Sequence, residues 1–384
     1  MKIDIKFAGI LVAGAVATSG IVLVATGGGD DKPKDPAAGT DPFPGAGGAG
    51  GTGPTPGATV PGAANPGAGA GGGTTQPQNL PLPEPGKQEA CPSATTTVRD
   101  AVSLQQQLNE AKPGDVIQLA PGVYKGQYRT QQSGLADKPI YLCGTARSVL
   151  DGGNADKGYG LQLEGAAYWR LIGFTVRNSQ KGVMLDGTSG SVVQGLTVRD
   201  TGDEGIHLRK FSTGNTVAYN NIFNTGTRNP RFGEGVYLGS SHKNWDQLTQ
   251  GQPDKSDNNL VAGNKIRATA EAVDIKEGTT GGRIYANVFD GSKLSGDQVN
   301  DSWVDAKGNN YVLDANHGSK TVADGFQTHE EYQGWGTGNV FRGNVIDLGG
   351  GKGVGINLNS DGNEVACDNK IMGGKKLLNK GNCS

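Results

Sequence analysis

The feature that most restricts the fold is a short repeat that recurs from the middle of the chain to its end. Eight segments alternate apolar and polar residues, most begin with Gly, and all can be aligned: 160–165, 182–187, 205–210, 235–240, 272–277, 303–308, 325–330 and 355–360. Read from the residue numbers, successive segments begin 22, 23, 30, 37, 31, 22 and 30 residues apart. A period near 22 with variable insertions is typical of a parallel β-helix.

A second set of short apolar segments follows most members of the first set. Its members are 173–178, 195–200, 220–225, 263–268, 286–291 and 343–348. In a β-helix each coil buries its apolar column against the next coil, and extra residues emerge as loops. Sandwiches and barrels need hairpin turns at close, regular spacing, and such turns are scarce in this sequence. We therefore predict an all-β fold, a single-stranded right-handed parallel β-helix.

The residues before the repeat predict one helix. Four apolar residues share one helical face: Ala101, Leu104, Leu108 and Ala111. Asp100 is suited to cap the amino terminus of this helix, and Pro113 follows its end. The helix is expected to be an N-terminal cap, because the open strand edge of the first coil would otherwise recruit another chain.

Composition divides the chain into three parts. Residues 7–26 form a largely apolar, uncharged run, so 1–26 is predicted to be a signal peptide or an uncleaved signal anchor. Residues 27–88 are mostly Gly, Pro, Ala and Thr, which predicts a disordered linker. Residues 89–384 are left for the β-helix domain. The protein is expected to be secreted, or tethered on the outer side of a membrane that it touches only through an uncleaved amino-terminal segment.

Charge and cysteine content narrow the partners and the compartment. The net charge of −2 gives no general attraction to nucleic acid, so no nucleic-acid partner is expected. The chain is expected to be a monomer. Four cysteines lie near the two ends of the folded part: Cys91, Cys143, Cys367 and Cys383. Three disulfide pairings are possible, and we favour Cys91 with Cys143 and Cys367 with Cys383, because each would fasten one end. A metal cluster is the alternative, but no CxxC spacing is present.

The alignment places charged residues in columns. Equivalent positions of successive coils lie about 4.8 Å apart, and residues beside the inward-pointing Val273 and its equivalents point outward. The first outward column holds Glu204, Glu234, Glu271 and Asp324. The second holds His207, Tyr237, Asp274, Asp305 and Gln327. The third holds Arg209, Lys276, Lys307 and His329.

Stacked carboxylates repel one another unless a cation neutralises them. Ca²⁺ prefers oxygen ligands, so the acidic residues predict a calcium site. Its predicted ligands are Glu271, Asp274, Glu234, Asp305 and Glu204. The alternative is a structural lattice of salt bridges between the acidic and the basic columns.

Several segments resemble the β-helical polysaccharide lyases, especially the chondroitinase B and alginate lyase family. The helix is followed by "PGDVIQLAPGVYKG" (113–126) and "KPIYLCGTARSVLDGG" (138–153), which are similar to the opening coils of that family. There, an acidic calcium ligand precedes a catalytic lysine base by five positions, a spacing that Glu271 and Lys276 reproduce. Pectate lyases with a lysine base are similar through "AEAVDIK" (270–276). The resemblance covers roughly residues 98–360, but only the 271–307 part is more than a generic β-helix pattern.

The resemblance implies an exported lyase that cleaves a uronic-acid-containing polysaccharide by calcium-assisted β-elimination. The C5 proton of a uronate is weakly acidic, so calcium would neutralise the neighbouring carboxylate. Lys276 would be the base, because the cation, Lys307 and Arg209 disfavour its ammonium form. Lys307 stands where the family usually has a catalytic arginine, and it or His329 would protonate or stabilise the leaving oxygen.

Aromatic residues in and beside the outward columns predict contacts with substrate. The insertions around this face carry Trp245, Trp303, Tyr332 and Trp335, whose rings could stack on sugars. The predicted substrate-binding residues are His207, Tyr237, Trp303 and Trp335. Aromatic rings packed over the β-helix are the alternative.

Two other functions fit parts of the sequence. A glycoside hydrolase on the same fold would use paired carboxylates from the acidic column and no lysine base. A non-catalytic, glycan-binding protein of the cell surface would explain the anchor and the linker, which suit display as well as secretion.

Overall fold

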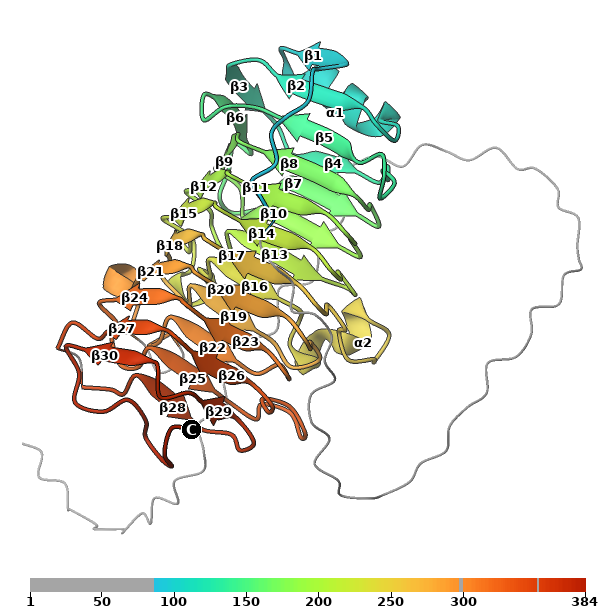
Figure 1. The fold of residues 1–384 in the computed structure, drawn as a ribbon. Helices are drawn as coiled ribbons and strands as arrows, with labels where there is room; N and C mark the ends of the chain where they lie inside the picture. The colour runs from blue at the N-terminus through green and yellow to red at the C-terminus, as the bar shows by residue number, and fades with distance from the viewer. Residues whose placement is uncertain (1–85, 297–299, 351) are drawn as a thin grey trace, which may run out of the picture. The chain divides into compact units, whose positions relative to one another are not determined.

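The computed structural model describes residues 86–384 except 297–299 and 351. The predicted signal segment and all but the last three residues of the predicted linker lie outside the described residues. In the described part, the chain forms three parallel sheets, and Figure 1 shows its coils stacked in chain order from β1 in blue to β30 in red. From β2 to β28 each coil contributes one strand to each of the three sheets, here called A, B and C in chain order; β1 precedes these coils, and β29 and β30 follow them.

Short strands make up all three sheets. Sheet A has eleven: β1 (Thr96–Val98), β2 (Val116–Leu119), β5 (Ile140–Cys143), β8 (Trp169–Ile172), β11 (Val192–Gln194), β14 (Thr216–Ala218), β17 (Leu260–Ala262), β20 (Arg283–Tyr285), β23 (Val312–Asp314), β26 (Val340–Arg342) and β29 (Glu364–Val365). Sheet B has ten: β3 (Gly122–Lys125), β6 (Ser148–Asp151), β9 (Thr175–Arg177), β12 (Thr197–Arg199), β15 (Asn221–Phe223), β18 (Lys265–Arg267), β21 (Val288–Asp290), β24 (His317–Ser319), β27 (Val345–Asp347) and β30 (Lys370–Met372). Sheet C has nine: β4 (Tyr128–Thr130), β7 (Tyr159–Glu164), β10 (Lys181–Asp186), β13 (Ile206–Arg209), β16 (Val236–Leu238), β19 (Val273–Ile275), β22 (Val304–Ala306), β25 (Phe326–Thr328) and β28 (Ile356–Leu358).

The predicted register of sheet C is confirmed. Val236 pairs with Val273, which pairs with Val304, and Asp274 lies between Tyr237 and Asp305 on the neighbouring strands. Val273 and Ile275 belong to the continuous apolar core, so alternation turns Asp274 to the outer face. The eight aligned segments are therefore the strands of sheet C from β7 onward, and the parallel β-helix prediction is confirmed.

Buried asparagines form a ladder ahead of the sheet B strands. Its members are Asn220, Asn264, Asn287, Asn316, Asn344 and Asn369. The side-chain Nδ2 of each donates to Oδ1 of the next at 2.8–3.0 Å. Each Oδ1 from Asn264 onward also accepts the backbone N–H of the preceding ladder residue. The amides thus satisfy one another inside the coil corner.

The helices are few and short. They are α1 (Ala101–Glu110), η1 (Pro230–Phe232), η2 (His242–Asn244), α2 (Trp245–Leu248) and η3 (Gly291–Lys293). Helix α1 begins as predicted, with Asp100 accepting the backbone N–H of Ser103, and it buries Leu104 and Leu108 in the core. Thr130 of β4 donates to the carbonyl of Leu108, which fastens α1 to the first coil. None of the helices in the described part is long and apolar enough to cross a membrane.

Two disulfides fasten the ends of the described chain. Cys91 is bonded to Cys143, and Cys367 to Cys383, so the favoured pairing is confirmed. The first bond ties the segment before β1 to β5. A second set of contacts holds the same segment, because Glu89 forms an ion pair with Arg170 at 2.9 Å.

Candidate active site on sheet C

Three predicted calcium ligands meet on the outer face of sheet C. Carboxylate oxygens of Glu234, Glu271 and Asp274 lie within 4.8 Å of one another. Glu234 and Glu271 precede β16 and β19, and Asp274 is the central residue of β19. All three side chains are buried. Clustered carboxylate oxygens are the donors that a hard cation such as Ca²⁺ prefers, so these residues fit such an ion.

The other two predicted calcium ligands lie outside this cluster and pair with basic groups. Glu204 contacts Lys181 at 2.7 Å and lies 3.5 Å from His207. Burial alone would raise the pKa of Glu204, but Lys181 and His207 together bring it well below its ordinary range. Asp305 behaves similarly, because His329 and Lys307 outweigh burial and lower its pKa.

The two lysines of the third column converge on one carboxylate. Nζ of Lys276 lies 3.0 Å from Oδ2 of Asp274, and Nζ of Lys307 lies 3.0 Å from Oδ1 of the same residue. Lys307 also contacts Asp305 at 2.6 Å, so its ammonium bridges two carboxylates. The prediction that Lys276 and Lys307 share one site with the acidic residues agrees with this geometry.

His329 extends the same network by one coil. Its Nδ1 donates to Oδ1 of Asp305 at 2.8 Å, and its Nε2 lies 2.8 Å from the Asn359 amide. The side chain of His329 remains 26% exposed. Asp305 and Asn359 thus engage both ring nitrogens, while part of the side-chain surface stays exposed.

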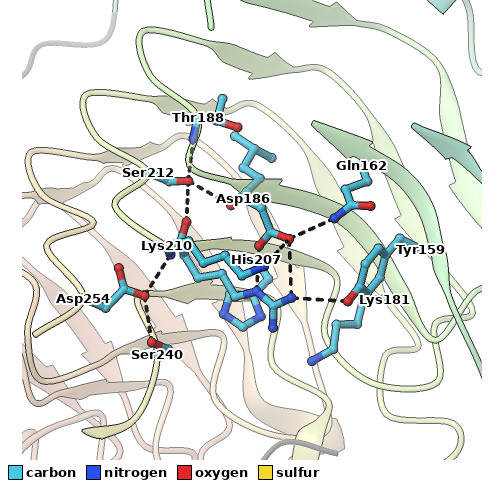
Figure 2. Close-up of polar contacts among 12 residues, drawn as sticks. Tyr159, Gln162, Lys181, Asp186, Thr188, His207, Lys210, Ser212, Ser240 and Asp254 are labelled. Atoms are coloured by element: carbon cyan, nitrogen blue, oxygen red, sulfur yellow. Dashed lines mark hydrogen bonds and ion pairs between the residues drawn. The ribbon is translucent and has the colours of Figure 1, made fainter. Parts of the chain in front are cut away.

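Arg209 lies in a separate network, two coils before Lys276. Its Nε donates to Asp186 at 2.7 Å and its Nη2 to the hydroxyl of Tyr159 at 3.3 Å. Figure 2 shows Asp186 with Gln162, which donates to it at 2.9 Å, and with Tyr159 nearby. Burial would raise the pKa of Asp186, but Arg209 and the other donors lower it to about 2. Gly239 takes the position between Arg209 and Lys276 in this column, so no side chain links the two networks there.

His207 and Tyr237, both predicted to bind substrate, are neighbours in the second column. Their rings are tilted at a centroid distance of 4.3 Å. Nε2 of His207 lies 2.9 Å from the carbonyl oxygen of Gly239. Nζ of Lys276 stands 5.3 Å from the centre of the Tyr237 ring. Tyr237 therefore forms one wall beside the predicted base.

The prediction that Trp303 binds substrate is wrong. Trp303 is fully buried in the core, where its ring packs edge to face on Phe326 at 6.1 Å. Gly318 and Gly325 leave room for the indole, since a Cβ on either would lie within 3 Å of it. Trp335 is partly exposed in the loop after His329, so its predicted role stays open.

Sequence reasoning left three residues of this region without a role. Glu277, which follows Lys276, is fully buried and accepts both the backbone N–H and the ring Nδ1 of His242. Lys181 occupies the acidic column one coil before Glu204, and the pairing of strands would have revealed it. Asp301 lies beside the acidic column. The side-chain amide of Gln327 donates to both Asp301 and Asp324.

Comparison with known proteins gives the family. Residues 87–252 match the family model described as Pel9A-like, right handed beta helix region. The alginate lyase of Paenibacillus sp. str. FPU-7 is 33% identical, with a TM-score of 0.68, over 74% of this chain and 98% of that enzyme. The chain belongs to the Pel9A-like right-handed β-helix family. No curated protein matches its sequence.

More distant structures are similar to this Pel9A-like protein in fold. A GH136 lacto-N-biosidase from Eubacterium ramulus is 12% identical with a TM-score of 0.52, over 73% of this chain and 61% of that one. The enzymatically active domain of tailspike protein 2 from bacteriophage CBA120 is 11% identical with a TM-score of 0.50, over 71% of this chain and 43% of that one. A hydrolase and a tailspike on the same fold mean that the chemistry must be argued from the site.

Proposed function

We propose that the protein is an exported polysaccharide lyase that cleaves alginate or a closely related polyuronate by β-elimination. The observation that carries the proposal is the pair Lys276 and Lys307, which share Asp274 beside the Glu234 and Glu271 carboxylates. The 33% identity to an alginate lyase supports the same reaction class and suggests the substrate. The two disulfides agree with export to an oxidising compartment.

The reaction needs one base and one acid. The base removes the proton from C5, the electron pair forms the C4–C5 double bond, and the bond from C4 to the glycosidic oxygen breaks. The departing oxygen then takes a proton. The products are a new chain end and an unsaturated uronate, with no water consumed.

Lys276 is the proposed base. Lys307 contacts the carboxylates of both Asp274 and Asp305, and it shares Asp274 with Lys276. Because one carboxylate serves two ammonium groups, its hold on the Lys276 proton is weakened, and the nearby positive charge of Lys307 favours the neutral amine. Lys307 is therefore assigned to positioning Asp274 and to keeping Lys276 available as a base.

His329 is the proposed acid. Lys307 is fully buried between two carboxylates, whereas the side chain of His329 is 26% exposed and is oriented by Asp305. Glu234, Glu271 and Asp274 would hold Ca²⁺, which would neutralise the carboxylate of the reacting uronate and so acidify C5. Tyr237 would line the same face beside Lys276, whereas His207 is fully buried and would support the Tyr237 ring instead of touching the sugar.

The base assignment is tested by Lys276→Ala. Formation of unsaturated product from alginate, followed by ultraviolet absorbance, should fall by roughly a thousandfold, as expected for loss of a general base. Lys265→Ala is the matched control, because Lys265 is an exposed lysine on β18 of sheet B and should leave the rate unchanged. Activity retained in Lys276→Ala would remove Lys276 from this role.

A hydrolase remains the second candidate because of one observation. Burial and the neighbouring carboxylates of Asp324 and Asp305 raise the pKa of Asp301 to about 6, although the Gln327 amide opposes this. A carboxylic acid beside a second carboxyl group is what a glycoside hydrolase requires. Asp301→Asn would abolish hydrolysis, whereas a lyase that depends on Lys276 should keep most of its activity.

A further inference from the structure

An aromatic cluster stands beside the carboxyl ends of the sheet C strands. The rings of His242, Trp245 and Tyr332, here called the aromatic platform, lie 5.2–6.2 Å apart between centroids. They come from two loops, one following β16 and one following β25. Figure 1 shows α2, which begins at Trp245, projecting from the side of the stack. The platform thus stands at the same edge of sheet C as Lys276, which follows β19, and His329, which follows β25.

One ring of the platform faces solvent, and the other two support it. Tyr332 is 46% exposed, although large aromatic side chains are usually buried, whereas Trp245 is only 5% exposed. The Trp245 indole donates to the carbonyl of Ser240 at 3.0 Å, and its ring would meet a Cβ placed on Gly278. An exposed ring held on a rigid base is suited to stack on the apolar face of a pyranose.

Glu277 ties the platform to the strand that carries the proposed base. Its Oε1 accepts the backbone N–H of His242 at 2.6 Å and the ring Nδ1–H at 2.7 Å. Glu277 is fully buried and directly follows Lys276. The His242 ring is held in one orientation by this carboxylate, and its Nε2 edge is left to face away from it.

We propose that the aromatic platform is a distal sugar-binding subsite, in which Tyr332 stacks on a uronate unit of the bound polysaccharide beyond the units that react. The inference rests on the proposed function for the identity of the polymer. Glu277 is a positioning residue that acts through His242. The occupant is a further unit of the substrate chain, because the platform continues the strand edge that holds Lys276 and His329.

Polymer binding to the inactive enzyme tests this subsite without turnover. In the Lys276→Ala background, Tyr332→Ala should raise the Kd for polymeric alginate, measured by calorimetry, by roughly tenfold. Tyr332→Phe keeps the ring and should bind within about twofold of the parent. Tyr285→Ala, which removes a partly exposed ring from β20 of sheet A, is the matched control and should have no effect. Unchanged binding in Tyr332→Ala overturns the proposal.

Glu277 is tested by non-additivity. Glu277→Ala should weaken polymer binding, and adding Tyr332→Ala to it should weaken binding much less than in the parent, because both changes disable one platform. Fully additive losses, or a loss of melting temperature with no change in Kd, would reduce Glu277 to a structural residue. In the active protein, Tyr332→Ala should raise KM for polymer more than it lowers kcat.

The two proposals fail separately. If the native protein makes no unsaturated product but binds alginate in a manner that depends on Tyr332, the lyase proposal falls and the subsite stands. If product forms while Tyr332→Ala binds polymer normally, the subsite falls and the lyase proposal stands.

Discussion

Two polar columns run along the stacked coils, and they satisfy their members in opposite ways. The asparagine ladder, from Asn220 to Asn369, repeats a group that is both donor and acceptor, so each amide bonds the next. The acidic column of Glu204, Glu234 and Glu271 repeats a group that only accepts. Each carboxylate must therefore find a cation or a donor from another column.

The acidic column solves this problem differently at its two ends. At the amino-terminal end, Lys181 pairs with Glu204, and in the third column Arg209 pairs with Asp186. In the next three coils the carboxylates are arranged differently. Carboxylate oxygens of Glu234, Glu271 and Asp274 lie within 4.8 Å of one another. Lys276 and Lys307 both contact Asp274. The comparison teaches that a repeated amide can satisfy its own hydrogen bonds, whereas gathered carboxylates need positive charge or donors from other columns.

The largest expected effect separates the two columns by activity. Glu271→Gln removes one charge from the carboxylate cluster and should lower the rate of unsaturated product formation by roughly a hundredfold to a thousandfold. With a chelator present in both samples, the melting temperature of Glu271→Gln should stay close to that of the native protein. The reason is that the substitution relieves repulsion among the three clustered carboxylates. A normal rate in Glu271→Gln would show that the cluster is only structural.

Asp186→Asn tests the ion pair between Asp186 and Arg209 through the free energy of unfolding. Arg209 would lose its buried partner, and breaking such a pair should cost about 3–5 kcal/mol of unfolding free energy at neutral pH. Because the folded pKa of Asp186 is about 2, its contribution is present above the ordinary value of 3.8 and is lost as pH falls toward 2. Denaturant titrations at pH 7 and pH 2 check both points, and an equal loss at both would contradict the ion-pair account.

Asn287→Ala tests the ladder itself. Asn287 is fully buried, donates to Asn316 and to the carbonyl of Val261, and accepts from Asn264. Leaving these groups without partners should cost about 2–4 kcal/mol in unfolding free energy. The rate per folded molecule should remain normal, since the ladder lies inside the corner. If Asn287→Ala lost activity but kept its full stability, the ladder would not be the structural column.

Asp257→Asn should give the smallest effect, and a gain. Burial raises the pKa of Asp257 to about 6 despite its hydrogen bond from Thr280. Between the ordinary value of 3.8 and about 6 the folded state binds the proton more tightly, so native stability falls as pH rises through this window. The amide should therefore stabilise the protein by about 1–2 kcal/mol at pH 8 and by almost nothing at pH 4. Thermal melts at both pH values measure the difference.

The sequence revealed sheet C and most of sheet B because their strands alternate and often begin with Gly. Sheet A escaped because strands such as Thr216–Ala218 and Leu260–Ala262 do not begin with such a glycine. The ladder left a signal that was not used, since Asn264, Asn287 and Asn344 each stand directly before a strand of the second aligned set. A one-letter column of Asn ahead of those strands would have found it.

The columns of the site were predictable, but the partners within them were not. Alignment placed Glu234, Glu271, Asp274 and Lys276 on one face because β-strand alternation fixes orientation. Extending the alignment to Lys181 would have shown its pairing with Glu204, but alignment could not show that His329 pairs with Asp305, because that depends on side-chain reach between coils. Trp303 was misplaced because two glycines on the next coil open the core to it, and only the packed structure reveals such space.

The central claim is that this face performs an elimination and not a hydrolysis. Alginate digested in water enriched with heavy oxygen and analysed by mass spectrometry tests it most directly. Elimination predicts unsaturated products without the heavy isotope, and none of these in Lys276→Ala. Saturated products that carry the heavy isotope would contradict the account and identify a hydrolase.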